Sequence, residues 1–551
     1  MESGYTVGDL VAEFLIQCGV QTVFGIASVH NIPMLDGIGR RNAPRFVMAR
    51  GELGGTHMAD GYARAGQRLG VMFSSTGPGA ANAVGGLIEA RFASSPVLHI
   101  TGQTATKFAD REMGTVHDPV DQLGMLRSVC KAAYRIRSPH QALGILTGAA
   151  AEALSAPMGP VSVEVPIDIQ RAPIPRPAGL DHLVLPVAAP PVAPDAAIAA
   201  LVTKIAAARR PMLWLGAGAR GAAAEIAALV ARGFGVVNSF AGRGILPEDH
   251  PMSLGALHGM GLEAVQEFYR DVDLLLVVGA RLRGQETGDF ALKLPENLVQ
   301  IDIDPMADGR TYANSLFVCG EAKATLAAVL ARLDDTARAE PGFAAAFTAM
   351  RDAARASFIA SLGAYGSFSA QLRAVMPRDA IWARDITQNH TTWGNRLFPL
   401  YHPSQNIYPV GAGIGQGLSL GIGAALGGGG RKTVVMTGDG GFFLNMGELW
   451  TIVQEQLDLV VLVMNDRGYG VIKRIQESTQ HGRRFYADLQ APALEGVARI
   501  AGMPFFRVTQ AEAFGETMAR TLAITGPSMV EVDMHQVGEF PAYYPFNQRP
   551  A

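Results

Sequence analysis

The chain has 551 residues, of which 48% are apolar and 64 are glycine, and its formal net charge at pH 7 is −3. This length predicts about three domains of ordinary size, the composition excludes a disordered chain, and the charge leaves no electrostatic footprint for nucleic acid. The 3 cysteines are scattered and predict neither a disulfide framework nor a metal cluster. With no signal-like N-terminus and no apolar run of about 20 residues, we expect a cytoplasmic protein without membrane contact.

Alternating helical patterns and short apolar runs predict an α/β fold with three doubly wound, parallel-sheet domains. The expected segments are an N-terminal domain over 1–170, a proline-rich linker over 171–194, a middle Rossmann-like domain over 195–335 and a C-terminal domain over 366–551. The last stretch, 537–551, has aromatic residues and prolines but no helical pattern, which predicts a lid.

Acidic and turn residues cluster between residues 50 and 103. Glu52 begins a predicted helix, where the helix dipole by itself favours an acidic side chain. The run 70–75 is a predicted strand, and the TGPG stretch after it predicts a strand-to-helix turn, with Gly77 in the turn and Asn82 in the next helix. Read alone, these residues need no role beyond local structure.

Two histidines lie in loops of the same segment. His30 follows the first predicted strand, QTVFGI, and His117 lies between two predicted helices. A single loop histidine is more often a surface residue than a catalyst. Because neutral imidazole can relay protons at ordinary pH, both positions are candidates for acid–base chemistry.

The middle segment contains Gly216-x-Gly218-x-x-Gly221 between a predicted strand and a predicted helix. This spacing is typical of a dinucleotide site and raises the alternative of an NAD dehydrogenase. The complete fingerprint needs an acidic residue at the end of the next strand to bind the ribose. That strand, GVVNSF, ends in Asn238 and Ser239, which disfavours the dehydrogenase.

The strongest pattern lies between residues 434 and 473. An apolar run ends at Gly438-Asp439-Gly440, a helical pattern begins near Phe442, and a second apolar run ends at Asn465. This predicts a βαβ unit with neighbouring strands, whose ligand lies beyond their carboxyl ends. Carboxylate and amide oxygens suit Mg²⁺, and glycines let a phosphate approach the backbone. We therefore predict a diphosphate bound through Mg²⁺.

GDG, then 24 residues, then Asn, resembles the diphosphate-binding motif of thiamine-diphosphate (ThDP) enzymes. Glu52 with the GYAR and TGPG stretches resembles the pyrimidine-binding domain of the acetolactate synthase large subunit, with benzaldehyde lyase and benzoylformate decarboxylase as related enzymes. The resemblance implies pyrimidine-binding, Rossmann-like and diphosphate-binding domains, in that order. It implies ThDP and Mg²⁺ as cofactors, leaves FAD in the middle domain open, and predicts a homodimer or homotetramer with sites at subunit interfaces.

The resemblance also implies roles for individual residues. Glu52 would exchange a proton with the aminopyrimidine of the cofactor, and His30 and His117 would relay protons to the substrate. The metal ligands would be Asp439, Asn465 and the main-chain carbonyl of Arg467. The other implied cofactor contacts are Gly77, Asn82, Gln388, Asn389, Ala412, Ile414, Gly438, Gly440, Gly441, Tyr469, Gly470 and Val471.

The implied reaction is the making or breaking of a C–C bond in a 2-oxo acid or a 2-hydroxy ketone through an enamine, as in acetolactate synthase. The alternatives are a 2-oxo acid decarboxylase and a benzaldehyde-lyase-type enzyme. Decarboxylases of the family have histidine where this chain has Ser74-Ser75, and pyruvate decarboxylases have glutamate where it has Ile472, which disfavours simple decarboxylation. A catalytically silent, cofactor-binding scaffold subunit is the alternative from another class, and the presence of Glu52 and Asp439 argues against it.

Overall fold

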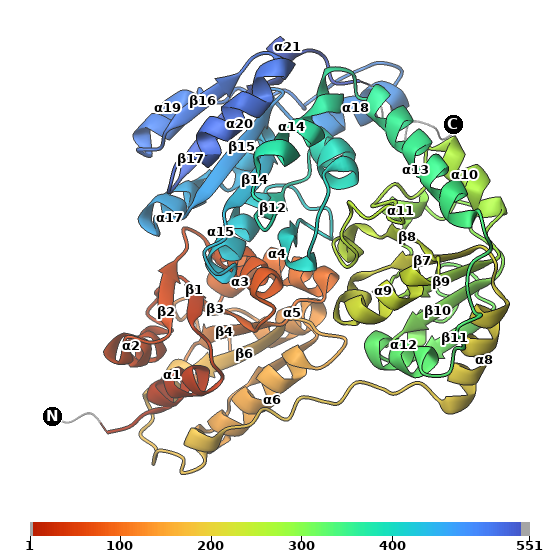
Figure 1. Cartoon of the computed structure of the whole chain (residues 1–551). Coiled ribbons are helices and arrows are strands. Elements are labelled where there is room, and N and C mark those ends of the chain that lie inside the picture. Colours follow the sequence, from red (N-terminus) through yellow and green to blue (C-terminus); the bar gives the residue numbers. More distant parts are fainter. Residues whose placement is uncertain (1–3, 542–551) are drawn as a thin grey trace.

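The computed structural model describes residues 4–541, which fold around three parallel β-sheets with helices packed against them (Figure 1). The prediction of an α/β fold with three parallel sheets is confirmed. None of the described helices is both long enough and apolar enough to span a bilayer. Most of the predicted lid, 537–551, lies outside the described residues.

The N-terminal sheet has six parallel strands in the order β2-β1-β3-β4-β6-β5. Its strands are β1 (Thr22–Gly25), β2 (Arg45–Met48), β3 (Gly70–Ser74), β4 (Val97–Gln103), β5 (Ala132–Arg135) and β6 (Val161–Pro166). Its helices are α1 (Val7–Gln17), α2 (Ile32–Arg41), α3 (Glu52–Gly66), α4 (Pro78–Ala93), α5 (Gln122–Val129), α6 (Ala142–Leu154) and α7 (Ile167–Arg171). Because β2, β1 and β3 are neighbours, the turns that follow them meet at one edge of the sheet.

The middle sheet has five parallel strands in the order β11-β10-β9-β7-β8. They are β7 (Pro211–Leu215), β8 (Gly235–Asn238), β9 (Leu274–Val278), β10 (Leu298–Asp302) and β11 (Leu316–Cys319). The helices of this region are α8 (Asp195–Ala207), α9 (Ala223–Ala231), α10 (Glu263–Arg270), α11 (Gly284–Thr287) and α12 (Ala322–Leu330). The chain then runs through α13 (Phe343–Ala360) to the C-terminal sheet.

The C-terminal sheet has six parallel strands in the order β13-β12-β14-β15-β17-β16. They are β12 (Ile381–Arg384), β13 (Asn406–Ile407), β14 (Thr433–Gly438), β15 (Leu459–Asn465), β16 (Phe505–Val508) and β17 (Ser528–Asp533). The helices are α14 (Phe368–Val375), α15 (Gly417–Gly427), α16 (Asp439–Leu444), α17 (Leu449–Gln454), α18 (Gly470–Thr479), α19 (Leu494–Ile500), α20 (Phe514–Leu522) and α21 (Met534–Val537).

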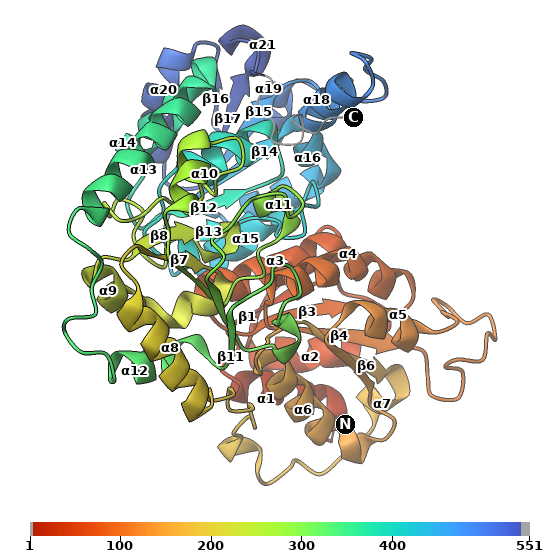
Figure 2. The same cartoon turned by 90° about the vertical axis from the view of Figure 1, so that its right-hand side faces the viewer.

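Helices α3 and α15 join the N-terminal and C-terminal sheets, and both views show them side by side (Figures 1 and 2). Glycines permit this contact: a Cβ on Gly61 would lie 2.0 Å from the carbonyl oxygen of Leu420, and one on Gly423 would lie 1.9 Å from that of Met58. These glycines, which would weaken an isolated helix, are therefore required by the close approach of two backbones. Apolar residues of both sheets share one buried core around this contact.

Candidate active site

The predicted βαβ unit is present at the carboxyl edge of the C-terminal sheet. Strands β14 and β15 are parallel neighbours, and Gly438 pairs with Met464, so Asp439 and Asn465 end adjacent strands. Helix α16 begins at Asp439, three residues before the predicted start near Phe442. An acidic side chain is favoured in the first turn of a helix, which explains the earlier start despite the following glycines.

Asp439 is buried, and only one of its two carboxylate oxygens accepts a hydrogen bond from the described residues. Its Oδ1 accepts a hydrogen bond from the backbone N–H of Asp466 at 3.2 Å, whereas its Oδ2 has no hydrogen-bond partner among the described residues. Burial and the neighbouring Asp466 raise the pKa of Asp439 to about 7. A cation beside Asp439 would favour its charged form, and the buried Oδ2 without a partner among the described residues fits a metal ligand.

The other two predicted metal ligands are held by local contacts. Asn465 Oδ1 accepts from the N–H of Arg467 at 3.1 Å, and its Nδ2 donates to Glu531 at 2.7 Å. Arg467 has a φ of 57°, and its carbonyl accepts from the ammonium of Lys473 at 3.1 Å. Within residues 4–541, no group of three or more His, Cys, Asp or Glu side chains is arranged to hold a metal ion. A metal here would therefore take most of its ligands from phosphate, water and neutral protein oxygens.

Close packing at this edge of the sheet requires glycine at several positions. A Cβ on Gly440 would lie 2.7 Å from the ring of Tyr469, and one on Gly441 would lie 2.7 Å from the carboxylate of Asp385. Gly470 is required by the neighbouring hydrogen bond between Gln388 and Asp466, because a Cβ there would lie 1.6 Å from the Asp466 carboxylate.

That bond joins Gln388 Nε2 to Asp466 Oδ2 at 2.9 Å, and the helix α18 that carries Val471 begins at Gly470. The adjacent side chain of Asn389 turns away. It accepts from the indole N–H of Trp393 at 2.7 Å and lies against Met534. The structure therefore brings Gln388, but not the carboxamide of Asn389, to the Asp466 side of the site.

The loop before α15 carries Ala412 and Ile414. Ala412 has a φ of 63°, an uncommon backbone conformation for a residue with a Cβ. Ile414 is 44% exposed, so it is not an ordinary core residue. Leu444, at the end of α16, is also exposed and contacts the loop at Gly415. The loop therefore exposes the apolar side chain of Ile414, although the backbone beside it is closely packed.

The N-terminal half of the site contains Glu52 at the start of α3. The carboxamide of Asn82 donates to Glu52 Oε2 at 3.2 Å, and Gly79 leaves room for Oε1, since a Cβ there would lie 2.8 Å from it. Gly77 has a φ of 57° and donates its N–H to Gln122 at 2.7 Å. The β3–α4 turn therefore forms the wall against which the Glu52 carboxylate lies.

His30 and His117 are brought together although they are far apart in the sequence. Their ring centroids are 5.4 Å apart, and His117 Nδ1 lies 3.2 Å from the hydroxyl of Ser75. The Ser75 hydroxyl in turn lies 2.6 Å from that of Ser28. Burial, and then the nearby His117, lower the pKa of His30, whose Nδ1 has no partner in the described part of the chain. The buried, neutral imidazole of His30 therefore lies beside the exposed imidazole of His117.

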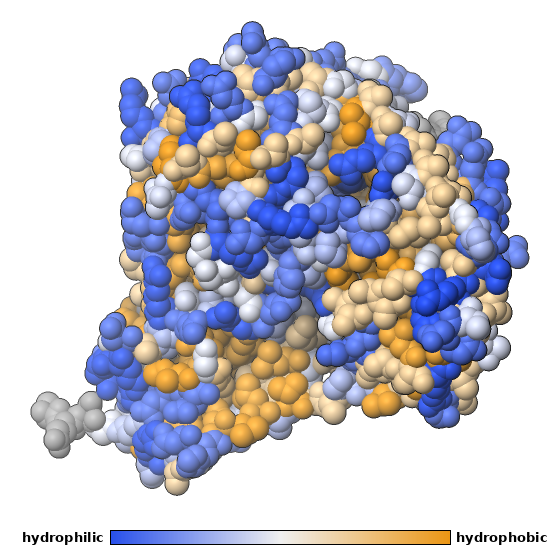
Figure 3. All heavy atoms as spheres, viewed as in Figure 1, coloured by the Kyte–Doolittle hydropathy of each residue, from blue (hydrophilic) through white to orange (hydrophobic). Residues whose placement is uncertain are grey.

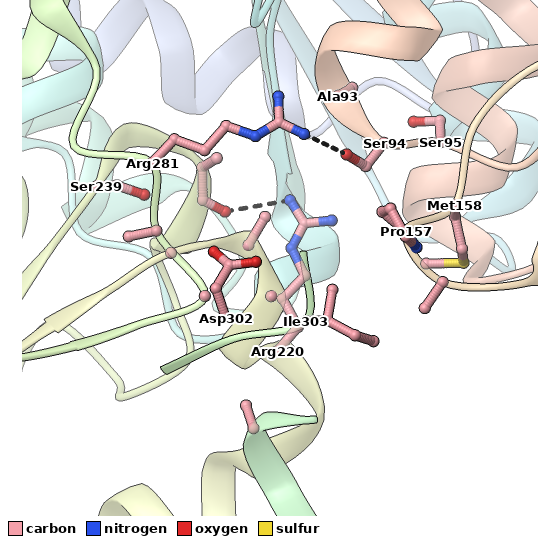
Figure 4. Close-up of a pocket in the computed structure, with 18 of the residues that line it drawn as sticks. Ala93, Ser94, Ser95, Pro157, Met158, Arg220, Ser239, Arg281, Asp302 and Ile303 are labelled. Carbon is pink, nitrogen blue, oxygen red and sulfur yellow. Dashed lines mark hydrogen bonds between the residues drawn. The ribbon is translucent and has the colours of Figure 1, made fainter. Parts of the chain in front are cut away.

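A cavity of about 470 Å³ lies apart from these residues, between the middle and N-terminal domains (Figure 4). Arg281 reaches across it to the hydroxyl of Ser94 at 3.5 Å. Arg220 donates to the carbonyl of Ala241 at 3.1 Å, but its Nε is buried without a partner among the described residues, and burial lowers its pKa to about 10. The cavity therefore contains a guanidinium without a carboxylate partner.

The dinucleotide-like glycines border this cavity but also have a packing role. A Cβ on Gly216 would lie 2.0 Å from the carbonyl oxygen of Gly279, and one on Gly218 would lie 2.9 Å from its Cα. Close packing of β7 against β9 thus explains these two glycines without a ligand. Burial also raises the pKa of Glu286, which lines the cavity and accepts from the N–H of Phe240 at 2.7 Å.

Sequence reasoning missed several residues at the sites. Ser75 was noted only for the histidine it replaces, and the role of Ser28 depends on a contact between two separate turns. Glu448 and Asp385 carried no local signal because their partners are distant in sequence. The apolar and glycine patterns around them predicted the turns, but not which polar groups would meet.

The three-sheet fold and the two half-sites fit the class of proteins that bind a diphosphate-bearing cofactor. Models of the thiamine pyrophosphate enzyme family match the chain in three places: the N-terminal TPP binding domain over 5–125, the central domain over 198–329 and the C-terminal TPP binding domain over 385–532. The three matches follow the order of the three sheets along the chain.

Individual relatives agree with these matches. The probable 2-ketoarginine decarboxylase of Pseudomonas aeruginosa is 34% identical over 85% of this chain and 83% of its own length. The large subunit of acetolactate synthase isozyme 1 from Escherichia coli is 29% identical over 86% and 84%, respectively. Acetolactate synthase 3 of Brassica napus is 28% identical over 95% and 83%. The chain belongs to the thiamine pyrophosphate enzyme family and is related to its acetolactate synthases and to a 2-oxo acid decarboxylase.

Proposed function

We propose that this protein makes or breaks a C–C bond next to the carbonyl of a 2-oxo acid or a 2-hydroxy ketone, as an acetolactate-synthase-like transferase or lyase. The observation that carries the proposal is the pair His30 and His117, which lie together at 5.4 Å on the domain that also presents Glu52. Both kinds of relative, the synthases and the decarboxylase, are named for reactions of this general type.

The C-terminal half of the site would hold the diphosphate and Mg²⁺. Asp439 and Asn465 would bind the metal with the Arg467 carbonyl, and the glycines of the Gly438–Gly441 turn would face the phosphates. The unpartnered Oδ2 of Asp439 supports this assignment. At the other end, the Ala412 carbonyl and Ile414 would contact the rings of the cofactor.

When bound, thiamine diphosphate supplies a carbon nucleophile that attacks the substrate carbonyl. Glu52 would hold and exchange the proton at N1′ of the aminopyrimidine, and its hydrogen bond from Asn82 at 3.2 Å would keep the carboxylate aimed at that atom. The partly buried position of Glu52 beside Gly79 limits water around the proton.

His30 and His117 would move protons at the substrate oxygen. Because its pKa is lowered by burial, His30 is neutral at physiological pH and its free Nδ1 can accept a proton. The Ser75 hydroxyl beside His117 Nδ1 would leave Nε2 of that ring for the substrate. These assignments require that substitutions at either histidine slow substrate steps and spare proton exchange on the cofactor.

A 2-oxo acid decarboxylase is the second candidate. It is favoured by the 34% identity to the 2-ketoarginine decarboxylase, and the two histidines could protonate a product despite Ser74 and Ser75. The deciding experiment supplies ThDP and Mg²⁺, offers a panel of 2-oxo acids, including one with a guanidinium group, together with aldehydes and acyloins, and identifies the products by mass. A coupled product supports the first candidate. Release of an aldehyde alone, even with an acceptor aldehyde in excess, supports the second.

The cavity between the middle and N-terminal domains could hold FAD without a redox role. Arg220 Nε, which has no partner among the described residues, suits a diphosphate, and Gly221 is open, since a Cβ there would meet only Glu321 at 4.0 Å. Flavin released from the purified protein by denaturation, and lost in an Arg220→Met variant, is the expected result. Protein that takes up no flavin on incubation with FAD would remove this cofactor from the proposal.

We also propose that the protein acts as a homodimer or homotetramer with sites shared between subunits. Apolar residues gather in patches over the N-terminal domain (Figure 3). Phe92 on α4 is 47% exposed, and Leu444 beside the candidate site is 52% exposed. Exposed apolar side chains next to a cofactor site are typical of a surface covered by a second subunit. Light scattering of the holoenzyme tests the subunit number.

A further inference from the structure

A buried carboxylate from the C-terminal domain holds the turn that carries Glu52. Glu448 Oε1 accepts from the backbone N–H of Arg50 at 2.9 Å and from that of Gly51 at 3.2 Å. Its Oε2 accepts from the hydroxyl of Thr451 at 2.8 Å. Glu448 is 2% exposed, and burial raises its pKa. Both amides precede Glu52 directly, so this carboxylate fixes the backbone from which the Glu52 side chain projects.

The sequence of α3 leaves room for this contact. A Cβ on Gly54 would lie 2.1 Å from Glu448 Oε1, which is closer than real atoms approach, so glycine at this position admits the carboxylate. The same region of the C-terminal domain makes two further contacts nearby: Thr451 donates to the carbonyl of Met48 at 3.3 Å, and Gln454 accepts from the Arg50 guanidinium at 2.7 Å.

The segment that ends at Glu448 begins at the candidate metal site. Asp439 starts α16, and a short turn after this helix leads to Glu448 at the end of the 3₁₀ turn Met446–Glu448. One continuous stretch of ten residues therefore joins the diphosphate anchor to the backbone of the candidate base.

A matching contact occurs with the two domains exchanged. Glu89 on α4 of the N-terminal domain accepts from the backbone N–H of Val410 at 2.6 Å and from that of Gly411 at 2.8 Å. These amides directly precede Ala412, the predicted ring contact of the C-terminal domain. Each sheet thus sends a buried glutamate to two successive amides of the other sheet, just before a residue expected to face the cofactor ring.

We propose that Glu448 is a positioning residue: by binding the amides of Arg50 and Gly51, it sets the direction of Glu52 towards the cofactor ring. This inference rests on the proposed role of Glu52 as the base. The function of the contact is hydrogen-bond acceptance, because the two donors are backbone amides and Glu448 forms no ion pair within the described residues. Glutamine can supply the same oxygen to the amides while its NH₂ group donates to Thr451.

The test measures three quantities on the holoenzyme: the rate of C2–H exchange of bound ThDP by NMR, the affinity for ThDP in Mg²⁺, and the thermal midpoint. Glu448→Ala should slow exchange at least tenfold while ThDP affinity changes less than threefold. Glu448→Gln should keep exchange within threefold of wild type. Gly54→Ala, which displaces the carboxylate without altering it, should reproduce the Glu448→Ala result if the latter protein fails to fold.

Gln454→Ala is the matched control, because it removes a side-chain contact from Arg50 at the same interface and leaves both amides bound. The C2–H group of ThDP bound to this variant should exchange at the wild-type rate. If Glu448→Ala and Gly54→Ala both exchange at the wild-type rate while Glu52→Gln does not, the positioning role is refuted and the base stands. Equal slowing of C2–H exchange in Gln454→Ala would also refute the positioning role, because a general loosening of the interface would then explain the effect of Glu448→Ala. Normal exchange in Glu52→Gln would instead overturn the proposed function.

Discussion

The N-terminal and C-terminal sheets have the same strand order, but the turns that follow their strands carry different functional groups. In both, the first strand of the sequence lies between the second and third, so corresponding turns occupy corresponding places. The turn after β3 carries Gly77 beside His117, whereas the turn after β14 carries Asp439. The turn after β2 carries Glu52, whereas the one after β13 leads to Ala412. The same strand order therefore presents the proposed proton-transfer groups in one sheet and the proposed cofactor-binding groups in the other.

The helices that join the two sheets show the same division. Helix α3 buries His57, Asp60 and Arg64, while α15 is built from glycine, alanine, serine and large aliphatic residues and has no titratable side chain. Under the proposed function, the N-terminal half supplies the proton-transfer groups and the C-terminal half binds the diphosphate of the cofactor. The expected effects of substitutions should separate along that line.

The largest effect is expected at the base. Glu52→Gln should lower turnover by about 10²–10⁴-fold, because general acid–base catalysis contributes that much and an amide cannot exchange the proton. ThDP affinity should change little, since the tail is held by the other half. Steady-state kinetics and calorimetry measure the two quantities. Full activity in this variant would contradict the division between the halves.

The opposite pattern is expected at the anchor. Asp439→Ala should weaken Mg²⁺-dependent ThDP binding by about 100-fold, because the metal loses its charged protein ligand. Turnover at saturating cofactor should recover in part. Calorimetric titration with ThDP at fixed Mg²⁺ measures the affinity. An unchanged affinity would show that the tail is held elsewhere.

A smaller effect is expected at the two histidines. His30→Ala and His117→Ala should each lower turnover by about 100-fold, the lower end of the contribution that general acid–base catalysis makes. C2–H exchange of bound ThDP should continue at the wild-type rate, because Glu52 is intact. Loss of exchange in either variant would place that histidine at the cofactor and not at the substrate.

The smallest effect concerns stability at acid pH. Burial lowers the pKa of His57 to about 4, below the value of about 6.5 in an unfolded chain. Between these values the unfolded state binds more protons, so this contribution to stability is complete above about pH 6.5 and declines as the pH falls towards 4. From pH 7.5 to 5.5, wild type should lose about 1 kcal/mol more than His57→Leu. Denaturant unfolding at both pH values measures the difference, and parallel losses would contradict a neutral, buried His57.

The sequence anticipated the sheets and the turns better than the contacts between them. The apolar runs predicted β3, β14 and β15 because a buried parallel strand needs a nearly continuous apolar stretch. The GDG turn was recognisable because glycine and aspartate act there through local geometry. The roles proposed for Glu52, His30, His117 and the metal ligands remain predictions for the experiments above.

Other features of the sites depend on neighbours that no local pattern reveals. Glu286 is buried and accepts a hydrogen bond from the N–H of Phe240, a contact that depends on how two loops of the middle domain pack. Asn389 follows Gln388 directly, yet its carboxamide bonds to Trp393, because the chain enters a helical turn at this point and successive side chains diverge. The exposure of Ile414 likewise depends on how its loop packs, because isoleucine is equally compatible with a buried position.

By itself, the sequence determined the α/β class, the positions of the strand ends and the residue types that could bind a diphosphate through a metal. These properties follow from periodicity and from the conformational freedom of glycine, both of which act over a few residues. Only the tertiary structure decided that His30 meets His117, and that Glu448 holds the turn of Glu52 across some 400 residues of chain. Such contacts depend on how the α3 and α15 backbones pack, and packing is a property of surfaces assembled from distant segments.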